Sequence, residues 1–317
     1  MNRTRRSLLK TLPAFALCAP LLKPDQSPDH KPDLQFPKEP RARLAVTSYP
    51  FREYIQSPTN RAFNPGKQAP NKEAMDLKDF PAFVINKFGV YNINPLSSHF
   101  RSTDSKYLDE FRESVEKAGS HMVGLGLSGG SFYDPDASKR KVAVDYGKKW
   151  IDIAVVVKSP SVRQHISGHK GAKPDVALAA ESLGQLADYG SKRNIIVNLE
   201  NDNPVAEDPF FLVDVIERVN SPYLRALPDF GNSLERHDAA YNEKAVTAMF
   251  KYAYSMVHVK DTVRSEGQHY SVDLGKMFAI AKASGYRGYF SMEYDTGSGD
   301  PIEGTVRLVQ QSLKYLT

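Results

Sequence analysis

The stretch Gly288-Tyr-Phe-Ser-Met-Glu-Tyr-Asp295 is an apolar run that carries a carboxylate, Glu293, near its end. A short run of this kind predicts a buried strand, where an unpaired charge is costly. Three further runs have a polar residue near the same end: Ile195–Glu200, Leu224–Asp229, and Tyr254–Val259 around His258. Four polar strand ends indicate a shared site rather than separate accidents.

Similar apolar runs recur from Leu44 onward, and segments with helical spacing of apolar residues separate them. We expect strands at Leu44–Tyr49, Gly89–Ile93, Met122–Leu127, Ser161–Ile166, Ile195–Glu200, Leu224–Asp229, Tyr254–Val259 and Gly288–Glu293. We expect helices at Tyr107–Ala118, Val176–Tyr189, Pro209–Val219, Leu274–Ser284 and Pro301–Leu316. This alternation over residues 44–317 predicts a (β/α)₈ TIM barrel in the α/β class.

The main alternative fold is a doubly wound open sheet. Its Gly-x-Gly-x-x-Gly turn would follow the first strand, and no such motif follows Leu44–Tyr49. The glycine-rich run Gly124–Gly130 lies in mid-chain with different spacing, so we expect a loop in which the backbone passes close to another group. A long segment rich in Pro, Asn and Lys, Gln56–Glu73, is expected to lie over the mouth of the barrel.

The N-terminus has a basic start and then a short apolar segment, as export signals do. The motif Thr4-Arg5-Arg6-Ser7-Leu8-Leu9-Lys10 resembles a twin-arginine signal. We expect residues 1–22 to be this signal, residues 23–43 to be a Pro-rich linker, and the chain to be exported to the periplasm. A retained membrane anchor is the alternative; otherwise no membrane contact is expected once the signal is removed. The chain's one cysteine, Cys18, lies in this segment, which excludes disulfides from the folded part.

The net charge of +5 depends largely on this segment. Residues 1–20 hold four basic residues and no acid, so without them the charge is about +1. A nearly neutral chain is poor evidence for a nucleic-acid surface, and we expect no nucleic-acid partner. With 41% hydrophobic and 25% charged residues, the composition is that of a globular protein.

In a TIM barrel, functional groups lie at the carboxyl ends of the strands, and neighbouring strand ends converge. The four polar residues of the last four predicted strands are Glu200, Asp229, His258 and Glu293. Three carboxylates in one pocket need a neutralising charge, and a divalent cation supplies it. Oxygen ligands with one imidazole suit Mn²⁺, Mg²⁺, Co²⁺, Fe²⁺ or Zn²⁺.

These residues lie in motifs that resemble the xylose isomerase-like TIM barrels, a family of sugar phosphate isomerases, epimerases and related endonucleases. The motifs are Asn198-Leu-Glu200-Asn-Asp, Pro228-Asp229-Phe-Gly-Asn232, Val257-His258-Val-Lys260-Asp261 and Ser291-Met-Glu293-Tyr-Asp. The resemblance to the ketose 3-epimerases implies that Glu200, Asp229, His258 and Glu293 hold one metal ion. It also implies that Arg264, six residues after His258, holds the substrate.

The resemblance implies a reaction in which a proton moves next to a carbonyl, through an enediolate. Glu200 and Glu293 would face the substrate carbon from opposite sides, one removing a proton and the other returning one. Two positions depart from the epimerase pattern. Asn232 replaces a histidine, and it can hydrogen-bond a hydroxyl but cannot carry charge. The second strand, which often ends in glutamate in the family, here continues into Asn94 and Pro95.

Further substrate-binding candidates lie near the same strand ends. His99 follows the second strand, and we expect it at the mouth of the barrel. Arg163 and His165 alternate with apolar residues on the fourth strand, so both are expected to point into the barrel. Lys260 follows His258. For Arg163 and His165 the alternative is a satisfied polar pair in the core; for Lys260 it is a salt bridge at the strand end.

The leading hypothesis is a metal-dependent sugar isomerase or epimerase that acts on a keto-sugar or sugar derivative, with a small-molecule sugar as its partner and a possible homo-oligomer. A lyase or hydratase acting on 3-keto-glycosides would use the same groups. An endonuclease-like phosphodiesterase would need more histidines and a basic groove. A non-catalytic sugar-binding barrel is the third alternative, although both acid–base glutamates are present.

Overall fold

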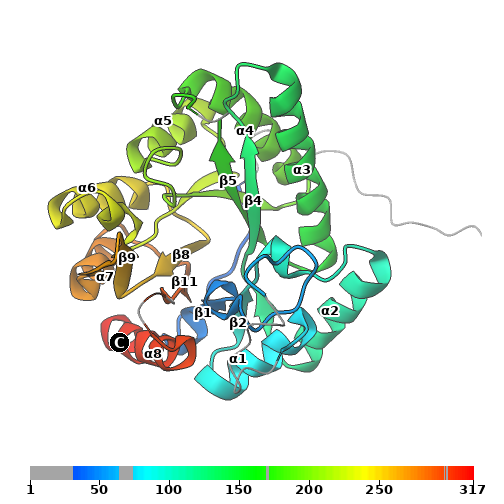
Figure 1. Cartoon of the computed structure of the whole chain (residues 1–317), viewed down its shortest axis with the longest axis vertical. Coiled ribbons are helices and arrows are strands. Elements are labelled where there is room, and N and C mark those ends of the chain that lie inside the picture. Colours follow the sequence, from blue (N-terminus) through cyan, green and yellow to red (C-terminus); the bar gives the residue numbers. More distant parts are fainter. Residues whose placement is uncertain (1–30, 64–73, 169–170, 296, 298) are drawn as a thin grey trace, which may run out of the picture. The chain divides into compact units, whose positions relative to one another are not determined.

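The computed structural model of the protein describes residues 31–63, 74–168, 171–295, 297 and 299–317. Lys31–Thr317 forms one compact unit, in which parallel strands form a ring and helices surround it (Figure 1). The expected signal, residues 1–22, lies outside the described residues, as does most of the expected loop at the barrel mouth. Among the described residues, no helix is long and apolar enough to cross a membrane.

The ring consists of two parallel sheets. In spatial order, the first contains β3 (His121–Met122), β2 (Asn92–Asn94), β1 (Leu44–Thr47), β11 (Tyr289–Met292) and β8 (Met256–Val259). The second contains β4 (Leu125–Ser131), β5 (Ser161–Ser167), β6 (Ile196–Glu200) and β7 (Leu224–Leu227).

Isolated bridges join the two sheets at both seams. Leu96 pairs with Gly126 at one seam, and Asp229 pairs with His258 at the other. The sheets therefore close into a barrel, which confirms the predicted (β/α)₈ fold. The core strands β1, β6 and β8 are buried at every residue, as expected for parallel strands that are covered on both faces.

The surrounding helices are α1 (Phe80–Phe88), α2 (Ser105–Lys117), α3 (Ala137–Val156), α4 (Val176–Ser191), α5 (Pro209–Val219), α6 (Ala239–Phe250), α7 (Leu274–Ala283) and α8 (Pro301–Leu316). Short 3₁₀ helices lie at Arg41–Arg43, Tyr49–Phe51, Leu77–Asp79, Ser97–His99 and Asn232–Glu235. Aspartates cap α2 to α8 by accepting from first-turn amides: Asp104, Asp136, Asp175, Asp208, Asp238, Asp273 and Asp300. Such caps satisfy amides that have no partner within the helix, and their charge suits that end of the helix dipole.

The composition of the glycine-rich run Gly124–Gly130 predicted a loop, and this prediction is wrong. The run lies largely in the strand β4. The close approach that we predicted is present, because a Cβ on Gly126 would lie 2.6 Å from Leu96 Cδ2 and 3.0 Å from Arg163 Nη2. Glycine therefore lets this strand pass beside a residue of the site. A register shift between Leu127 and Gly130 shows that the strand is irregular but still paired.

Two features were not predicted. An antiparallel hairpin, β9 (Thr262–Ser265) and β10 (Gln268–Ser271), follows β8 at the site end of the barrel. The described part of the expected linker packs on the barrel: Pro32 O accepts a 3.0 Å hydrogen bond from Tyr254 Oη, and the Phe36 ring meets the Tyr254 ring edge to face at 5.3 Å. This segment is therefore anchored rather than free.

Candidate metal centre

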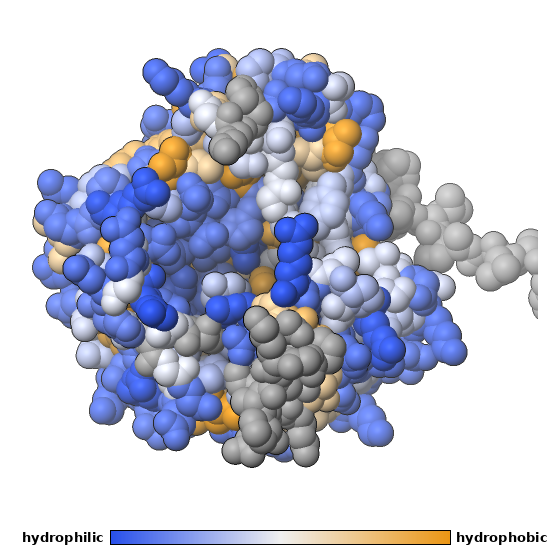
Figure 2. Space-filling model, in the orientation of Figure 1, coloured by the Kyte–Doolittle hydropathy of each residue, from blue (hydrophilic) through white to orange (hydrophobic). Residues whose placement is uncertain are grey.

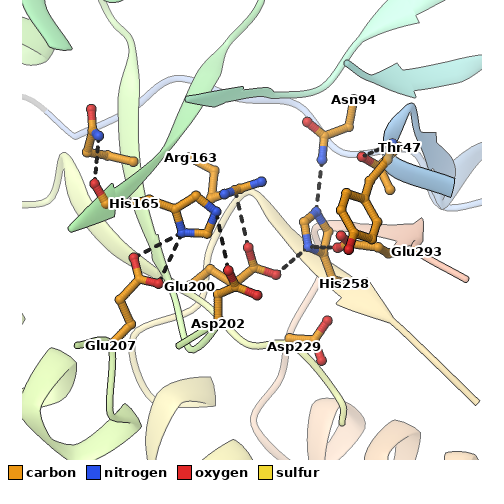
Figure 3. Close-up of polar contacts among 12 residues, drawn as sticks. Thr47, Asn94, Arg163, His165, Glu200, Asp202, Glu207, Asp229, His258 and Glu293 are labelled. Atoms are coloured by element: carbon orange, nitrogen blue, oxygen red, sulfur yellow. Dashed lines mark hydrogen bonds and ion pairs between the residues drawn. The ribbon is translucent and has the colours of Figure 1, made fainter. Parts of the chain in front are cut away.

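The four predicted ligands come together at the carboxyl ends of neighbouring strands. Glu200 ends β6, Asp229 follows β7, His258 lies in β8 and Glu293 follows β11. Each offers one ligand atom, and these atoms all lie within 4.8 Å of one another. All four side chains are buried, and Figure 3 shows the His258 ring between the two glutamates.

The His258 ring is held at both nitrogens. Its Nδ1 lies 2.5 Å from Glu200 Oε1 and also contacts Glu293 Oε2, while its Nε2 lies 2.9 Å from Asn94 Nδ2. One N–H cannot make a straight hydrogen bond to two carboxylate oxygens, so Nδ1 and these oxygens face a common point. This convergence suits a metal ion better than a hydrogen-bonded triad.

Asn94 adds a second sign that the cluster fits a metal. Its Oδ1 is buried and has no hydrogen-bond partner among the residues that the structure describes. The two ends of an amide are interchangeable by a flip, which would let Oδ1 accept a proton from Nε2 of His258. The lone pair on Nδ1 would then face the carboxylates, which is the tautomer that a metal ligand needs.

Asp229 is only half satisfied. Its Oδ1 accepts hydrogen bonds from the backbone amides of Gly231 at 2.8 Å and Asn232 at 2.9 Å. Its Oδ2 is buried without a hydrogen-bond partner in the described part of the chain, and Lys260 Nζ lies 3.3 Å away. Burial raises the pKa of Asp229 to about 7, against the opposing influence of Lys260. This oxygen faces the Lys260 ammonium but accepts no hydrogen bond from the described residues, so it keeps a lone pair for a second cation.

The expectation that a metal alone would neutralise the acids needs correction. Two buried cations already lie against them: Arg163 Nε is 3.2 Å from Glu200 Oε2, and Lys260 contacts Asp229. Burial acts to raise the pKa of Glu200, but His258 and Arg163 outweigh it and hold that pKa well below its ordinary value. The fit of a metal therefore depends on the open ligand atoms rather than on excess negative charge.

A cavity of about 280 Å³ opens above the cluster, and Figure 2 shows a hollow lined mostly by hydrophilic residues on this face. The predicted site residues that line it are Arg163, His165, Glu200, Asn232, Lys260, Arg264 and Glu293. Both candidate acid–base glutamates thus reach the space where a substrate would lie. Tyr49, Asp202 and Glu235 also line it.

His165 is the centre of a second cluster. Its Nδ1 lies 3.0 Å from Glu207 Oε1 and its Nε2 lies 3.5 Å from Asp202 Oδ2 (Figure 3). Glu207 is itself fixed by the backbone amides of Ile166 and Asn203. Sequence reasoning did not single out Asp202 or Glu207. Asp202 ends the motif that contains Glu200, whereas nothing in the spacing of Glu207 indicates that its loop folds back onto β5.

His99 lies behind the cavity wall rather than on it. It is 1% exposed, and its Nδ1 lies 2.7 Å from Ser48 Oγ. Ser48 Oγ accepts from the Leu96 amide, which leaves its own proton available to His99 Nδ1. Burial, with a smaller effect of Arg52, lowers the pKa of His99 to about 3. His99 therefore lies where it supports the strand end, and it is not among the residues that line the cavity.

Arg264 reaches the cavity from β9. The Arg264 amide donates to Asp295 Oδ2 at 2.7 Å, which ties the hairpin to the segment after β11. Asn232 also has a defined place: its Oδ1 accepts from Lys260 Nζ at 2.5 Å, and its Nδ2 lies 3.4 Å from Asp202 Oδ1. Asn232 thus links the two polar clusters on one wall.

Comparison with solved structures supports the fold. The chain is similar to D-psicose 3-epimerase from Clostridium cellulolyticum H10, at 14% identity over 86% of this chain and 98% of that chain, with a TM-score of 0.64. It is similar to an L-ribulose 3-epimerase, at 15% identity over 87% and 95%, with a TM-score of 0.64. It is also similar to 3-keto-D-glucoside 4-epimerase from E. coli, at 13% identity over 86% and 98%, with a TM-score of 0.58.

At these identities the likeness shows the fold alone, and no curated protein matches the sequence. A family model gives a firmer assignment. The model of the xylose isomerase-like TIM barrel matches residues 87–317, well over half of the chain and all of the ligand cluster. The chain therefore belongs to the xylose isomerase-like TIM barrel family.

Proposed function

We propose that the protein is a divalent-metal-dependent sugar isomerase or epimerase. The observation that carries this proposal is the buried convergence of Glu200, Asp229, His258 and Glu293, with both glutamates reaching a polar cavity. The named structural neighbours that act as ketose 3-epimerases add support at the level of fold. A keto-sugar or a sugar derivative is the proposed substrate.

In this proposal, Glu200 and Glu293 carry the proton. One begins as a carboxylate and takes a proton from the carbon beside the substrate carbonyl, which gives an enediolate. The other begins as a carboxylic acid and returns a proton to the opposite face, so the carbon is inverted and the proton count balances. Return of the proton to the neighbouring carbon instead would give aldose–ketose isomerisation.

The cluster Glu200, Asp229, His258 and Glu293 would hold one ion of Mn, Mg, Co, Fe or Zn. When bound, such an ion polarises a carbonyl oxygen and stabilises the negative charge that develops on it. Arg163 fixes the Glu200 carboxylate through its 3.2 Å contact. Substrate hydroxyls would meet His165, Asn232, Lys260 and Arg264 on the cavity wall.

A lyase or hydratase that acts on a 3-keto-glycoside is the second candidate. The buried Lys260 favours it, because its ammonium group lines the cavity beside the cluster. Burial acts to lower the pKa of Lys260, but Asp229 and Glu293 outweigh it and hold the pKa well above its ordinary value. A lysine that stays charged can hydrogen-bond a departing oxygen and stabilise the negative charge that develops on it. The neighbour 3-keto-D-glucoside 4-epimerase makes this substrate class reasonable to test.

The test begins with metal content by elemental analysis of the purified protein, beside the Glu200→Gln, Glu293→Gln double variant. We expect about one divalent ion per chain in the wild type and loss of that ion in the variant. Ketoses are then incubated in heavy water, and deuterium incorporation is followed by NMR. We expect exchange at the carbon next to the carbonyl with wild type and none with the variant.

Other outcomes would replace this proposal. About three zinc ions per chain, with cleavage of a phosphodiester, would favour the endonuclease-like alternative. Absence of bound metal after incubation with each candidate ion would leave a sugar-binding barrel. Elimination products in place of an exchanged ketose would favour the lyase.

We propose further that the protein is exported by the twin-arginine route and acts in the periplasm, as the motif around Arg5 and Arg6 suggests. The Arg5→Lys, Arg6→Lys variant should accumulate in the cytoplasm, whereas the wild type should appear in the periplasmic fraction. Equal distribution of both forms would contradict this proposal.

A further inference from the structure

A second cavity adjoins the reaction cavity. Its volume is about 770 Å³, whereas the reaction cavity has about 280 Å³. The volume of the reaction cavity suits a single sugar ring better than a larger ligand. Ser97, Ser98 and Ser128 line both cavities. A ligand that occupies the reaction cavity can therefore extend across this serine wall.

The second cavity is basic. Arg61, Arg101 and Lys149 line it, and no acid is among the described residues of its lining. Arg101 has an acidic neighbour in Asp76, whose Oδ2 lies 3.8 Å from its Nη1, a loose pair for an arginine that is 58% exposed. Three cations around one hollow attract and orient an anionic group, and arginine suits a carboxylate or a phosphate.

The same cavity has an aromatic floor. The Trp150 side chain is largely buried, and its ring packs against Phe100 at 5.6 Å and Tyr146 at 6.3 Å between centroids. Tyr146 Oη lies 3.4 Å from Ser97 Oγ, which connects the floor to the serine wall. Aromatic surface beside hydroxyl groups suits a ligand with both apolar and polar faces, as a sugar ring has.

We propose that the substrate is a glycoside or disaccharide whose remote part carries a carboxylate or a phosphate. Its reacting ring lies in the reaction cavity and its anionic part in the second cavity, against Arg61, Arg101 and Lys149. This inference rests on the proposed function for the reacting ring. The size and the cationic lining of the second cavity support the assignment of the remote, anionic part of the substrate.

Trp150 makes the proposal directly testable, because it is the one tryptophan in the chain and lines the second cavity. Its fluorescence is titrated with lactobionate against lactose, and with trehalose 6-phosphate against trehalose. We expect a saturable change with at least one anionic probe, at a dissociation constant about tenfold below that of its neutral counterpart, and weakening with added salt. Which anionic probe binds more tightly separates carboxylate from phosphate recognition.

Charge variants provide the matched control. The Arg101→Gln, Lys149→Gln double variant should bind the anionic probe about tenfold more weakly and leave the neutral probe unchanged. Lys148→Gln removes the same charge from the neighbouring position of α3, where the Lys148 ammonium lies over the Tyr189 ring at 5.6 Å. This variant should bind like the wild type.

The Glu200→Gln, Glu293→Gln variant separates this proposal from the proposed function. It should keep the preference for the anionic probe, because neither glutamate lines the second cavity. Equal binding of anionic and neutral probes would overturn the proposal, as would a preference that the Arg101→Gln, Lys149→Gln variant retains. Absence of any saturable change in Trp150 fluorescence would also overturn it.

Discussion

Asn94 lies against the His258 ring and would orient it toward a bound metal. Its amide touches Nε2 and leaves Nδ1 for the carboxylate cluster. Removal of such an orienting partner typically weakens metal binding by about 10–100-fold. We therefore predict that Asn94→Ala lowers the affinity by this factor, measured by competition with a chelator of known strength.

Two further variants sharpen this prediction. Asn92→Ala is the matched control, because Asn92 lies on the same strand but donates to Ala42 O and Leu44 O. It should reduce stability and leave metal affinity unchanged. Asn94→Asp can only accept from Nε2, so it should keep the affinity if Asn94 acts as the acceptor. Wild-type affinity in Asn94→Ala would show that Asn94 does not orient the ring.

His99 makes the stability of the folded chain depend on pH. Its pKa is about 3 in the folded state, against an ordinary value of 6.5, because burial disfavours the charged ring. Between these values the unfolded chain binds a proton that the folded chain does not, so stability is full above pH 6.5 and falls as the pH drops. The loss is about 1.4 kcal/mol per pH unit within this window.

The measurement compares urea unfolding of wild type and His99→Asn at several pH values across this window. Asparagine can still accept the proton of Ser48, whose Oγ lies 2.7 Å from Nδ1, so the fold should be retained. The difference in unfolding free energy between the two proteins should shrink by about 1.4 kcal/mol per unit as the pH falls. A constant difference would mean that His99 becomes protonated without unfolding.

At the scale of single elements, two glycines carry opposite predictions for the same substitution. Gly267 forms the turn of the β9–β10 hairpin with φ +82°, and its partner Glu266 has φ +50°. Gly184 lies within helix α4, and a Cβ there would meet nothing within 4 Å. Gly267→Ala should destabilise the protein by about 1 kcal/mol, whereas Gly184→Ala should stabilise it by about 0.5–1 kcal/mol.

Chemical unfolding of both variants at one pH measures these effects. Neither alanine creates a clash, since the space around the added Cβ is open at both positions, so the backbone angle alone distinguishes them. Destabilisation by both variants would show that the hairpin turn is not the cause of the difference.

The sequence predicted the elements whose signal is local. The barrel strands are continuous apolar runs, and the helices predicted from the sequence have periodic apolar faces. The hairpin from Thr262 to Ser271 gave no such signal, because most of its residues are polar and lie at the surface, where alternation is weak. The full length of β4 could not be predicted either, because its glycines lack the side chains by which a strand is recognised in a sequence.

The candidate site divides in the same way. The candidate cluster could be predicted because each of its four residues lies at a strand end, a position that the fold itself fixes. Partners that arrive through loops could not: Glu207 reaches His165 from the segment before α5, and Ser48 hydrogen-bonds His99 from the turn after β1. Such contacts depend on tertiary folding rather than on spacing along the chain.

On the scale of the whole barrel, the four candidate ligands lie on both sides of one seam. Glu200 ends β6 and Asp229 follows β7, both strands of the β4–β7 sheet. His258 lies in β8 and Glu293 follows β11, both strands of the other sheet. In the described chain only isolated bridges join β7 to β8, one of them between Asp229 and His258 themselves. A metal bound by all four residues would therefore link the two sheets where backbone pairing is sparse.

This geometry predicts where metal removal loosens the protein. Hydrogen exchange of the His258 amide, bonded to Pro228 O at 3.1 Å, and of the Phe230 amide, bonded to His258 O at 3.2 Å, should speed up after chelation. The other seam is the internal control: the Gly126 amide, bonded to Pro95 O at 2.9 Å, should exchange at an unchanged rate. At a free metal concentration of 100 times Kd, binding should also stabilise the fold by about 2.7 kcal/mol, which thermal unfolding measures. Exchange that rises equally at both seams would indicate general destabilisation, and exchange that rises at neither would place the metal away from this cluster.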